Sequence, residues 1–276
     1  MNKKIVKIKK KHVFLALLAI VLLVGVVKAY RAWIGTTRIA FLNYQAIALG
    51  QISNANDNGM IKLSEITTDD FDHLEDYDMI LVNGMGLRID EQQRKQLEEA
   101  SYKVPTLTHA ATNPANNIVS VDNFDADYLM QYIENGSKKN YRNMLAYIRK
   151  FIDGKKFQAP EPDRVDERPD YLLTHFDPKD EKGDELGFNS IREYNAFLAK
   201  NGLYKEGAPT IMLTGFMGAA PDMEKAFEKK GFMVYRINKL QSFIAGHYAD
   251  SIQANAVVNM AHGRLGDYFV EFLKQK

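Results

Sequence analysis

The chain has 276 residues and a formal net charge of +1; 46% of its residues are hydrophobic and 26% are charged. This composition is typical of a globular protein rather than a disordered one, and the length allows one large domain or two of ordinary size. The balanced charge argues against a nucleic-acid partner. The absence of cysteine excludes disulfides, thiolate metal sites, cysteine nucleophiles and a lipid-modified cysteine.

The first forty residues carry the pattern of an export signal. A lysine-rich start precedes the apolar run VFLALLAIVLLVGVV at residues 13–27. Fifteen residues are short for a spanning helix, which needs about 20, but the following KAYRAWIG has side chains suited to a membrane interface. We therefore expect residues 1–36 to form a cytoplasmic basic segment and a transmembrane helix at residues 13–34. A cleaved signal is the alternative.

This topology predicts an inner-membrane protein that crosses the membrane once, because the lysine cluster keeps the N-terminus in the cytoplasm. The bulk of the chain is then expected in the periplasm.

Strands alternate with helices from residue 37 to residue 154, which predicts a doubly wound, flavodoxin-like parallel sheet. Asp90 has the chemistry of a helix N-cap, Pro105 is expected near the start of a strand, and Gly136 is expected just after a helix. The predicted strands are RIAFLNY (38–44), MIKLSEI (60–66), DMILVNG (78–84) and VPTLTHA (104–110). The predicted helices are residues 90–100, 123–136 and 138–154.

Residues 155–207 are expected to form a linker with one short helix, because they begin with a proline-rich, charged stretch. The acidic loop DPKDEKGDELG within it fails as an EF-hand, since Lys179 stands at a ligand position. The alternation of strand and helix patterns in residues 208–276 predicts a second doubly wound parallel-sheet unit. Its three predicted strands are PTIMLTG, FMVYRI and NAVVNM. It is expected to be incomplete, because its last helix would normally lead into a further strand.

Catalytic motifs are missing from the sequence. There is no Walker loop, HExxH or GxSxG. The turn GFMGAAP has only Gly215 and Gly218 where a dinucleotide fingerprint needs three glycines. The carboxylates between Asp69 and Asp76 are interpreted as a solvated helix face. No nucleophile and base are spaced in a way that indicates catalysis.

Polar residues that follow predicted strands are the candidate site, because ligands of open α/β sheets bind outside the carboxyl ends of the strands. His262 and Arg264 in HGRLG are the main candidates, since an imidazole can ligate a metal and a guanidinium can pair with a carboxylate. The alternative for each residue is a structural role such as helix capping. Further residues at such ends are Asn43, Tyr44, Asn83, Met85, His109, Gly215, Met217 and Asn259.

The order of these segments resembles the N-terminal part of the CobN and magnesium-chelatase large-subunit family. The resembling segments include RIAFLNYQAIALGQISNANDNG, YDMILVNGMG, NGSKKNYRNMLAYIRKF, GLYKEGAPTIMLTG and AVVNMAHGRLGDYFVEFLK. Within the family the chain is most similar to the membrane-anchored HmuS-type proteins of Bacteroidetes haem-uptake systems. It departs from the family where Asn135-Gly136 replaces a Gly-Gly pair, in the short GFMGAAP loop, and in lacking the large body that follows.

The resemblance implies a tetrapyrrole ligand, with cobalt or magnesium chelation or haem dechelation as the activity of the whole family member. The expected function is the head region of such a chelatase, a fragment without the catalytic body and inactive alone. The expected partners are the inner membrane, the missing C-terminal part and a haem-uptake receptor. Tetrapyrrole-binding residues would be His262, Arg264, Asn259, His109 and Tyr44, with His262 on the metal. The alternatives are a non-catalytic tetrapyrrole or metal carrier and a docking module.

Overall fold

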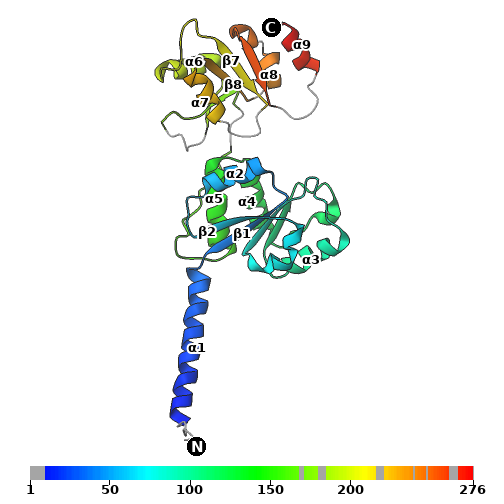
Figure 1. The fold of residues 1–276 in the computed structure, drawn as a ribbon, viewed down its shortest axis with the longest axis vertical. Coiled ribbons are helices and arrows are strands. Elements are labelled where there is room, and N and C mark those ends of the chain that lie inside the picture. The colour runs from blue at the N-terminus through cyan, green and yellow to red at the C-terminus, as the bar shows by residue number, and fades with distance from the viewer. Residues whose placement is uncertain are drawn as a thin grey trace, which may run out of the picture. The chain divides into compact units, whose positions relative to one another are not determined.

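The computed structural model describes residues 10–167, 171–179, 185–215, 221–238, 240–246, 248–260 and 267–275. The chain divides into two compact units, and each has α/β architecture (Figure 1). The first unit comprises Met1–Gln45, Ala55–Gly136 and Asn140–Val165. The second unit comprises Ala46–Asn54, Ser137–Lys139 and Asp166–Lys276.

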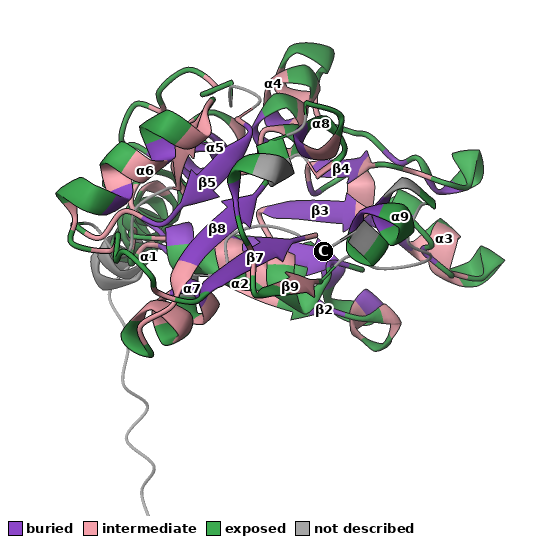
Figure 2. Ribbon diagram, turned by 90° about the horizontal axis from the view of Figure 1, so that it is seen from above, coloured by how far each residue is buried: buried purple, intermediate pink, exposed green. Residues whose placement is uncertain are grey.

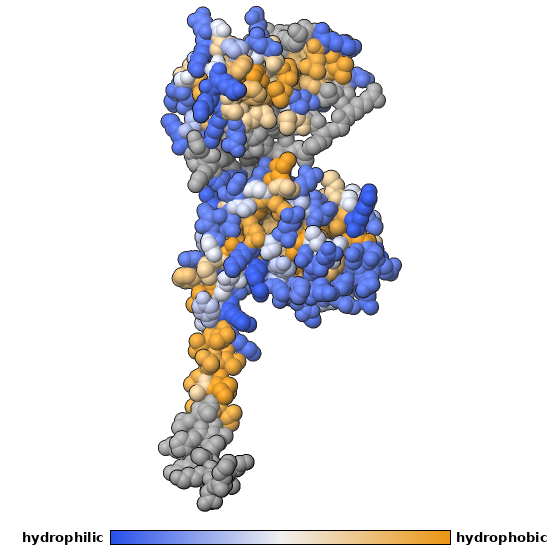
Figure 3. Space-filling model, viewed as in Figure 1, coloured by the Kyte–Doolittle hydropathy of each residue, from blue (hydrophilic) through white to orange (hydrophobic). Residues whose placement is uncertain are grey.

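The first described element is the 24-residue helix α1 (Lys10–Trp33), whose visible surface is largely hydrophobic (Figure 3). Its apolar side chains, such as Leu17 and Val26, are exposed. Over the described residues, however, no helix combines the length and the apolarity needed to cross a membrane. The prediction of a transmembrane helix at residues 13–34 is therefore wrong. The unbroken apolar run has only fifteen residues, and extending it brings Lys28 and Arg31 into the helix.

The first unit contains a sheet of four parallel strands in the order β2-β1-β3-β4. Strand β1 is central: Ile39 pairs in register with Leu63 on one side and with Met79 on the other. The direction of winding therefore reverses between β1 and β3, which is the topological switch point where doubly wound folds bind ligands. The strands are β1 (Thr37–Leu42), β2 (Ile61–Ile66), β3 (Met79–Asn83) and β4 (Thr106–His109).

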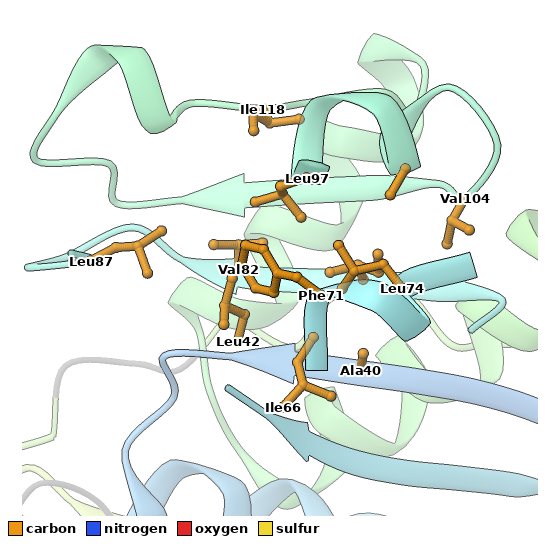
Figure 4. Packing of buried hydrophobic residues seen from close by; sticks show 12 residues of the cluster. Ala40, Leu42, Ile66, Phe71, Leu74, Val82, Leu87, Leu97, Val104 and Ile118 are labelled. Atoms are coloured by element: carbon orange, nitrogen blue, oxygen red, sulfur yellow. The ribbon is translucent and has the colours of Figure 1, made fainter. Parts of the chain in front are cut away.

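Apolar side chains from the strands and from the segments that connect them form the core of this unit (Figure 4). Val82 of β3, Phe71 of η1 and Leu97 of α3 are all buried in one cluster. Burial of each such side chain contributes about 1.5–3 kcal/mol. The helical elements that follow β1 in this part of the chain are α2 (Ala46–Ala55), η1 (Thr68–Asp76), α3 (Glu91–Ser101), η2 (Pro114–Asn116), α4 (Asn123–Glu134), α5 (Lys138–Tyr147) and the π-helix η3 (Ile148–Ile152). Residues 46–54 of α2 and 138–139 of α5 belong to the second unit.

Local sequence signals set the ends of several elements. Asp90 caps α3: its side chain accepts a hydrogen bond from the Gln93 amide, and the Gln93 side chain accepts one from the Asp90 amide. The predicted N-cap is confirmed. Pro105 directly precedes β4, and Gly136 directly follows Asn135, the C-cap of α4. The surface around α3 is hydrophilic, as its sequence EQQRKQLEEAS requires (Figure 3).

A buried arginine ties distant parts of the first unit together. Arg149 lies in η3 and its side chain is fully buried. Its guanidinium donates hydrogen bonds to six oxygens from three separate segments of the chain. These acceptors are the carbonyls of Ile34 (3.3 Å), Gly35 (3.0 Å), Met60 (3.3 Å), Phe157 (2.7 Å) and Gln158 (2.9 Å) and the hydroxyl of Thr37 (2.8 Å).

The second unit contains a mixed sheet, in the order β6-β5-β8-β7-β9. Strands β8, β7 and β9 are parallel, but β5 is antiparallel to both β6 and β8. The prediction of a purely parallel sheet with three strands is therefore wrong for this unit. The strands are β5 (Leu173–His175), β6 (Leu186–Phe188), β7 (Thr210–Thr214), β8 (Met233–Ile237) and β9 (Ala256–Asn259).

Buried aromatic residues dominate the core of the second unit. Tyr194, Phe243 and Phe269 are almost fully buried beside Leu173 and Met212 of the sheet. Figure 2 shows β5, β7 and β8 mostly buried, with more exposed helices around them. Helix α7 begins at Pro221, and Gly231 (φ 89°) follows its end, as predicted. The helical elements are α6 (Ile191–Lys200), α7 (Pro221–Lys229), α8 (Leu240–Ala245), η4 (Tyr248–Ser251) and α9 (Asp267–Gln275).

Candidate functional site

The carboxyl edge of the first sheet is shaped by Asn43, the residue after β1. Its backbone is left-handed, with φ of 60°, a conformation that asparagine tolerates better than most residues. Its side-chain amide donates hydrogen bonds to the carbonyls of Asn83 (2.7 Å), the last residue of β3, and Met85 (3.0 Å), which follows that strand. Asn43 therefore joins the ends of β1 and β3 at the switch point. Left-handed non-glycine residues often mark functional sites, and Ala110 after β4 (φ 53°) is a second one.

Gly84 brings the next two strand ends together. Its amide donates a hydrogen bond to the His109 carbonyl (2.8 Å), and its carbonyl accepts one from the Thr112 amide (3.3 Å). A Cβ atom on Gly84 would lie 2.6 Å from Cα of Ala111, which is part of the backbone. Glycine is required here because the two backbones approach so closely.

Replacing Gly84 by alanine should lower the free energy of unfolding of the first unit by about 1–3 kcal/mol, because the added methyl group overpacks the strand ends. Denaturant unfolding can be followed by fluorescence of Trp33, the single tryptophan. Gly59→Ala is the matched control, since a Cβ there meets nothing within 4 Å. Equal stability of the two variants would contradict the close approach.

Tyr44 and His109 lie side by side at this edge, with ring centroids 5.3 Å apart. The Tyr44 hydroxyl and His109 Nε2 are both buried, and neither has a hydrogen-bond partner within the described part of the chain. Buried polar atoms are normally paired, so two unpaired ones in contacting rings are an unusual feature. The structure therefore brings together two of the residues predicted from sequence.

Burial determines the protonation of both side chains. It lowers the pKa of His109, so the imidazole is neutral at physiological pH. Burial, with a smaller contribution from Tyr141, raises the pKa of Tyr44 well above its usual value, so the phenol keeps its proton. The pair thus offers an uncharged imidazole nitrogen, which can ligate a metal, and a hydroxyl donor.

The other predicted site residues are placed differently. Asn259 ends β9 in the second unit and pairs in register with Thr214 of β7. His262 and Arg264 lie outside the described residues, as does Met217. The acidic residues Asp69 and Asp70 lie at the start of η1, where Asp70 accepts hydrogen bonds from Thr67.

The second unit contains a buried cluster of charged side chains that sequence reasoning missed. His175 Nε2 lies 2.8 Å from a Glu228 carboxylate oxygen, and both groups are nearly or fully buried. Glu224 is fully buried; it accepts a hydrogen bond from the Phe176 amide (3.2 Å) and lies 3.5 Å from the Arg236 guanidinium. Arg236 also forms an ion pair with Glu185.

Two pKa values in the cluster are displaced upward. Burial raises the pKa of Glu224 to about 7, although Arg236 and His175 act against this. Burial disfavours the charged form of His175, but the hydrogen bond to Glu228 and the charge of Glu224 outweigh it and raise the pKa of His175. Of the residues described, no three histidine, aspartate or glutamate side chains are arranged to hold a metal ion. The raised pKa values of Glu224 and His175 make the cluster a titratable part of the core.

No sequence signal locates this cluster. Glu224 and Glu228 are spaced four apart on α7, in the charged sequence PDMEKAFEK, and nothing in that sequence distinguishes them from exposed carboxylates. They are buried because β5, which the sequence did not predict, places His175 beside them. The structure is thus that of an α/β protein. The first unit has, at the carboxyl edge of its sheet, two polar side chains that are unpaired within the described residues, and the second unit has a buried ionic cluster.

Comparisons with known proteins give a distant similarity. No family model matches the chain, and no curated protein matches it. Among solved structures, it is similar to the catalytic subunit of cobaltochelatase from Mycobacterium tuberculosis, with 13% sequence identity and a TM-score of 0.42. The similarity covers 72% of this chain and 16% of that chain.

Proposed function

We propose that the chain is a CobN-like, chelatase-related protein that binds a tetrapyrrole at the carboxyl edge of its first sheet. The observation that carries this proposal is the contacting pair of Tyr44 and His109, whose buried hydroxyl and Nε2 have no partner in the described residues. The resemblance of the sequence to the CobN family supplies the class of ligand. Metal insertion or removal is what that resemblance implies for whole family members.

The chemistry of the two side chains suits a metal tetrapyrrole. A neutral imidazole is a good ligand for iron or cobalt, and the lowered pKa of His109 keeps it neutral. The Tyr44 hydroxyl can donate a hydrogen bond to a ligand carboxylate, such as a propionate. Both polar atoms are buried, so binding requires the ring pair to separate. Binding is favoured because the Tyr44 hydroxyl and His109 Nε2, both unpaired in the described residues, obtain partners.

Titration of the full chain with haemin and with metal-free protoporphyrin IX tests the proposal. We expect both pigments to bind, with a shifted Soret band for haemin. His109→Ala should alter the haemin spectrum and leave protoporphyrin binding nearly unchanged, because only haemin has a metal to ligate. Tyr44→Phe should weaken binding of both by about 1.5–3 kcal/mol, the value of a hydrogen bond to a charged group.

His73→Ala is the control, because the His73 side chain is 74% exposed in the same unit. The site assignment is wrong if His109→Ala and Tyr44→Phe bind both pigments like the parent. The function is wrong if the parent binds neither. His262→Ala and Arg264→Ala extend the titration to the residues outside the described ranges. A periplasmic location and a haem-uptake partner stay predictions.

A further inference from the structure

The first unit contains a cavity of about 280 Å³ away from the sheet edge described above. Its walls come from three places: residues 55–58 before β2, helix α5, and the segment of residues 160–163. The Asp163 amide donates a hydrogen bond to Asn143 Oδ1 on α5 (3.3 Å), and the Tyr132 hydroxyl of α4 donates one to the Asp163 carbonyl. These bonds hold the segment of residues 160–163 against the helices.

Asn143 is the polar side chain that indicates a ligand in this cavity. Only 6% of the residue is exposed, and its Nδ2 is buried without a hydrogen-bond partner among the residues described. The orientation of the Asn143 side-chain amide is fixed by its oxygen, because the backbone N–H of Asp163 needs an acceptor and Oδ1 provides it. A buried amide donor therefore remains unpaired in the wall of a cavity, where a ligand oxygen would satisfy it.

The charges that line the cavity are of both signs and remain apart. Arg142 forms no ion pair or hydrogen bond with any described residue, although Asp57, Glu161 and Asp163 line the same cavity. Glu161 pairs instead with Lys150. A purely anionic ligand would meet these carboxylates, and a purely cationic one would meet Arg142. A ligand that carries both charges can satisfy both.

We propose that this cavity binds a free α-amino acid as its zwitterion. The ligand carboxylate accepts hydrogen bonds from Asn143 Nδ2 and from Arg142, and the ammonium group lies toward Asp57 and Asp163. The apolar wall of Ala55, Leu145 and Ala146 is available to the side chain of the ligand. This inference is independent of tetrapyrrole binding, because it concerns different residues.

The first test is a charge-deletion series on the unmodified full chain. Binding of each of the proteinogenic L-amino acids is measured by saturation-transfer NMR and then by calorimetry. For the best amino acid, two analogues follow: the acid without its amino group and the amine without its carboxyl group. We expect each analogue to bind about 10- to 100-fold more weakly, because each loses charge-assisted hydrogen bonds. An analogue that binds as tightly as the amino acid overturns the zwitterion, and no binding at all overturns the site.

The second test locates the site. Asn143→Asp keeps an oxygen for the Asp163 amide and replaces the free donor with an acceptor that repels a carboxylate. We expect this variant and Arg142→Gln to weaken binding by about 10- to 100-fold. Arg88→Gln is the control, because Arg88 is an exposed arginine of the same unit that does not line the cavity. If Arg142→Gln binds like the parent, the cavity is not the site; the analogue series decides the outcome even if Asn143→Asp fails to fold.

Discussion

Replacing Arg149 by methionine is expected to lower the free energy of unfolding of the first unit by about 3–5 kcal/mol, the usual cost of removing one partner from a buried charged network. Methionine fills a similar volume but donates no hydrogen bonds. The variant would leave five carbonyls and the Thr37 hydroxyl without the donor that now pairs with them. Asp153, which accepts hydrogen bonds from Thr37 (2.6 Å) and Lys155 (2.9 Å), would lose a nearby positive charge.

Trp33 makes this measurement specific to the first unit. Its carbonyl accepts hydrogen bonds from the Lys156 and Phe157 amides, and the Lys156 ammonium lies 5.0 Å from its ring. Denaturant unfolding followed by Trp33 fluorescence therefore reports on the segments that Arg149 joins. Arg94→Met is the control: within the described part of the chain Arg94 pairs only with exposed Glu91, so its loss should lower the free energy of unfolding by less than about 1 kcal/mol.

Arg149→Lys separates charge from geometry. Lysine retains the positive charge but has three donors on one nitrogen instead of a planar fork, so it cannot reach all six oxygens. We expect a stability between those of the parent and of Arg149→Met. A Met variant within about 1 kcal/mol of the parent would show that the network is not a main source of stability.

The stability of the second unit should fall as the pH rises from about 4.5 to about 7. Glu224 holds its proton up to about pH 7 in the folded unit, whereas an ordinary glutamate has a pKa of 4.5. Folding therefore takes up a proton in this range, and the free energy of unfolding decreases with pH. The stabilisation is fully present below pH 4.5 and is lost as the pH rises through the folded pKa.

The size of this loss is on the order of 3 kcal/mol, from about 1.4 kcal/mol per pH unit over the interval between the two pKa values. Solvent does not screen this contribution, because Glu224 is fully buried. His175 acts with the same sign, since its pKa is also raised. Its share of the stability is present below its ordinary pKa and is lost as the pH rises through the displaced value.

Glu224→Gln should remove most of this pH dependence, because the amide does not titrate. Unfolding is measured by far-UV circular dichroism, which reports on both units. Trp33 fluorescence reports on the first unit, so a transition seen by circular dichroism alone is assigned to the second unit. Glu206→Gln, in an exposed loop of that unit, should keep the pH profile of the parent. A parent profile that is flat between pH 4.5 and pH 7 would mean that Glu224 ionises normally.

The strands of the first unit could be predicted from sequence because each is a short apolar run with clear punctuation. The prediction of residues 78–84 contains β3, and Pro105 and Asp90 mark element boundaries for reasons that are local to the backbone. The edge pair Tyr44 and His109 followed from the rule that parallel strands present their carboxyl ends together. Their close contact could not be predicted, because it depends on the left-handed turn at Asn43.

Helical periodicity failed at Arg149. Phe151 is one of the apolar residues at helical spacing in residues 138–154, yet it is 47% exposed, whereas Arg149 is fully buried. The π-helix η3 explains the difference, because its wider turn shifts the faces of the helix relative to an α-helix. No residue in the sequence indicates that turn.

The antiparallel strands of the second unit were missed for a different reason. Strands β5 and β6 have three residues each, which is too short for an alternating pattern to appear. Gly187 in β6 looked like part of a polar loop. The structure shows why it is glycine: a Cβ there would lie 1.8 Å from the Tyr171 ring. Only the neighbouring strand reveals that constraint.

The Arg149 network also has a consequence for the order in which the protein is made. Gly35 and Arg149 are 114 positions apart, and Arg149 also binds the carbonyls of Phe157 and Gln158. A chain emerging from the ribosome can pair β1 to β4 early, since these strands end at His109. It cannot pair the backbone carbonyls of Ile34 and Gly35 with their charged partner until residue 149 has emerged. The sheet therefore forms before the hydrogen bonds of Arg149 can form. The rate of translation sets the length of that interval.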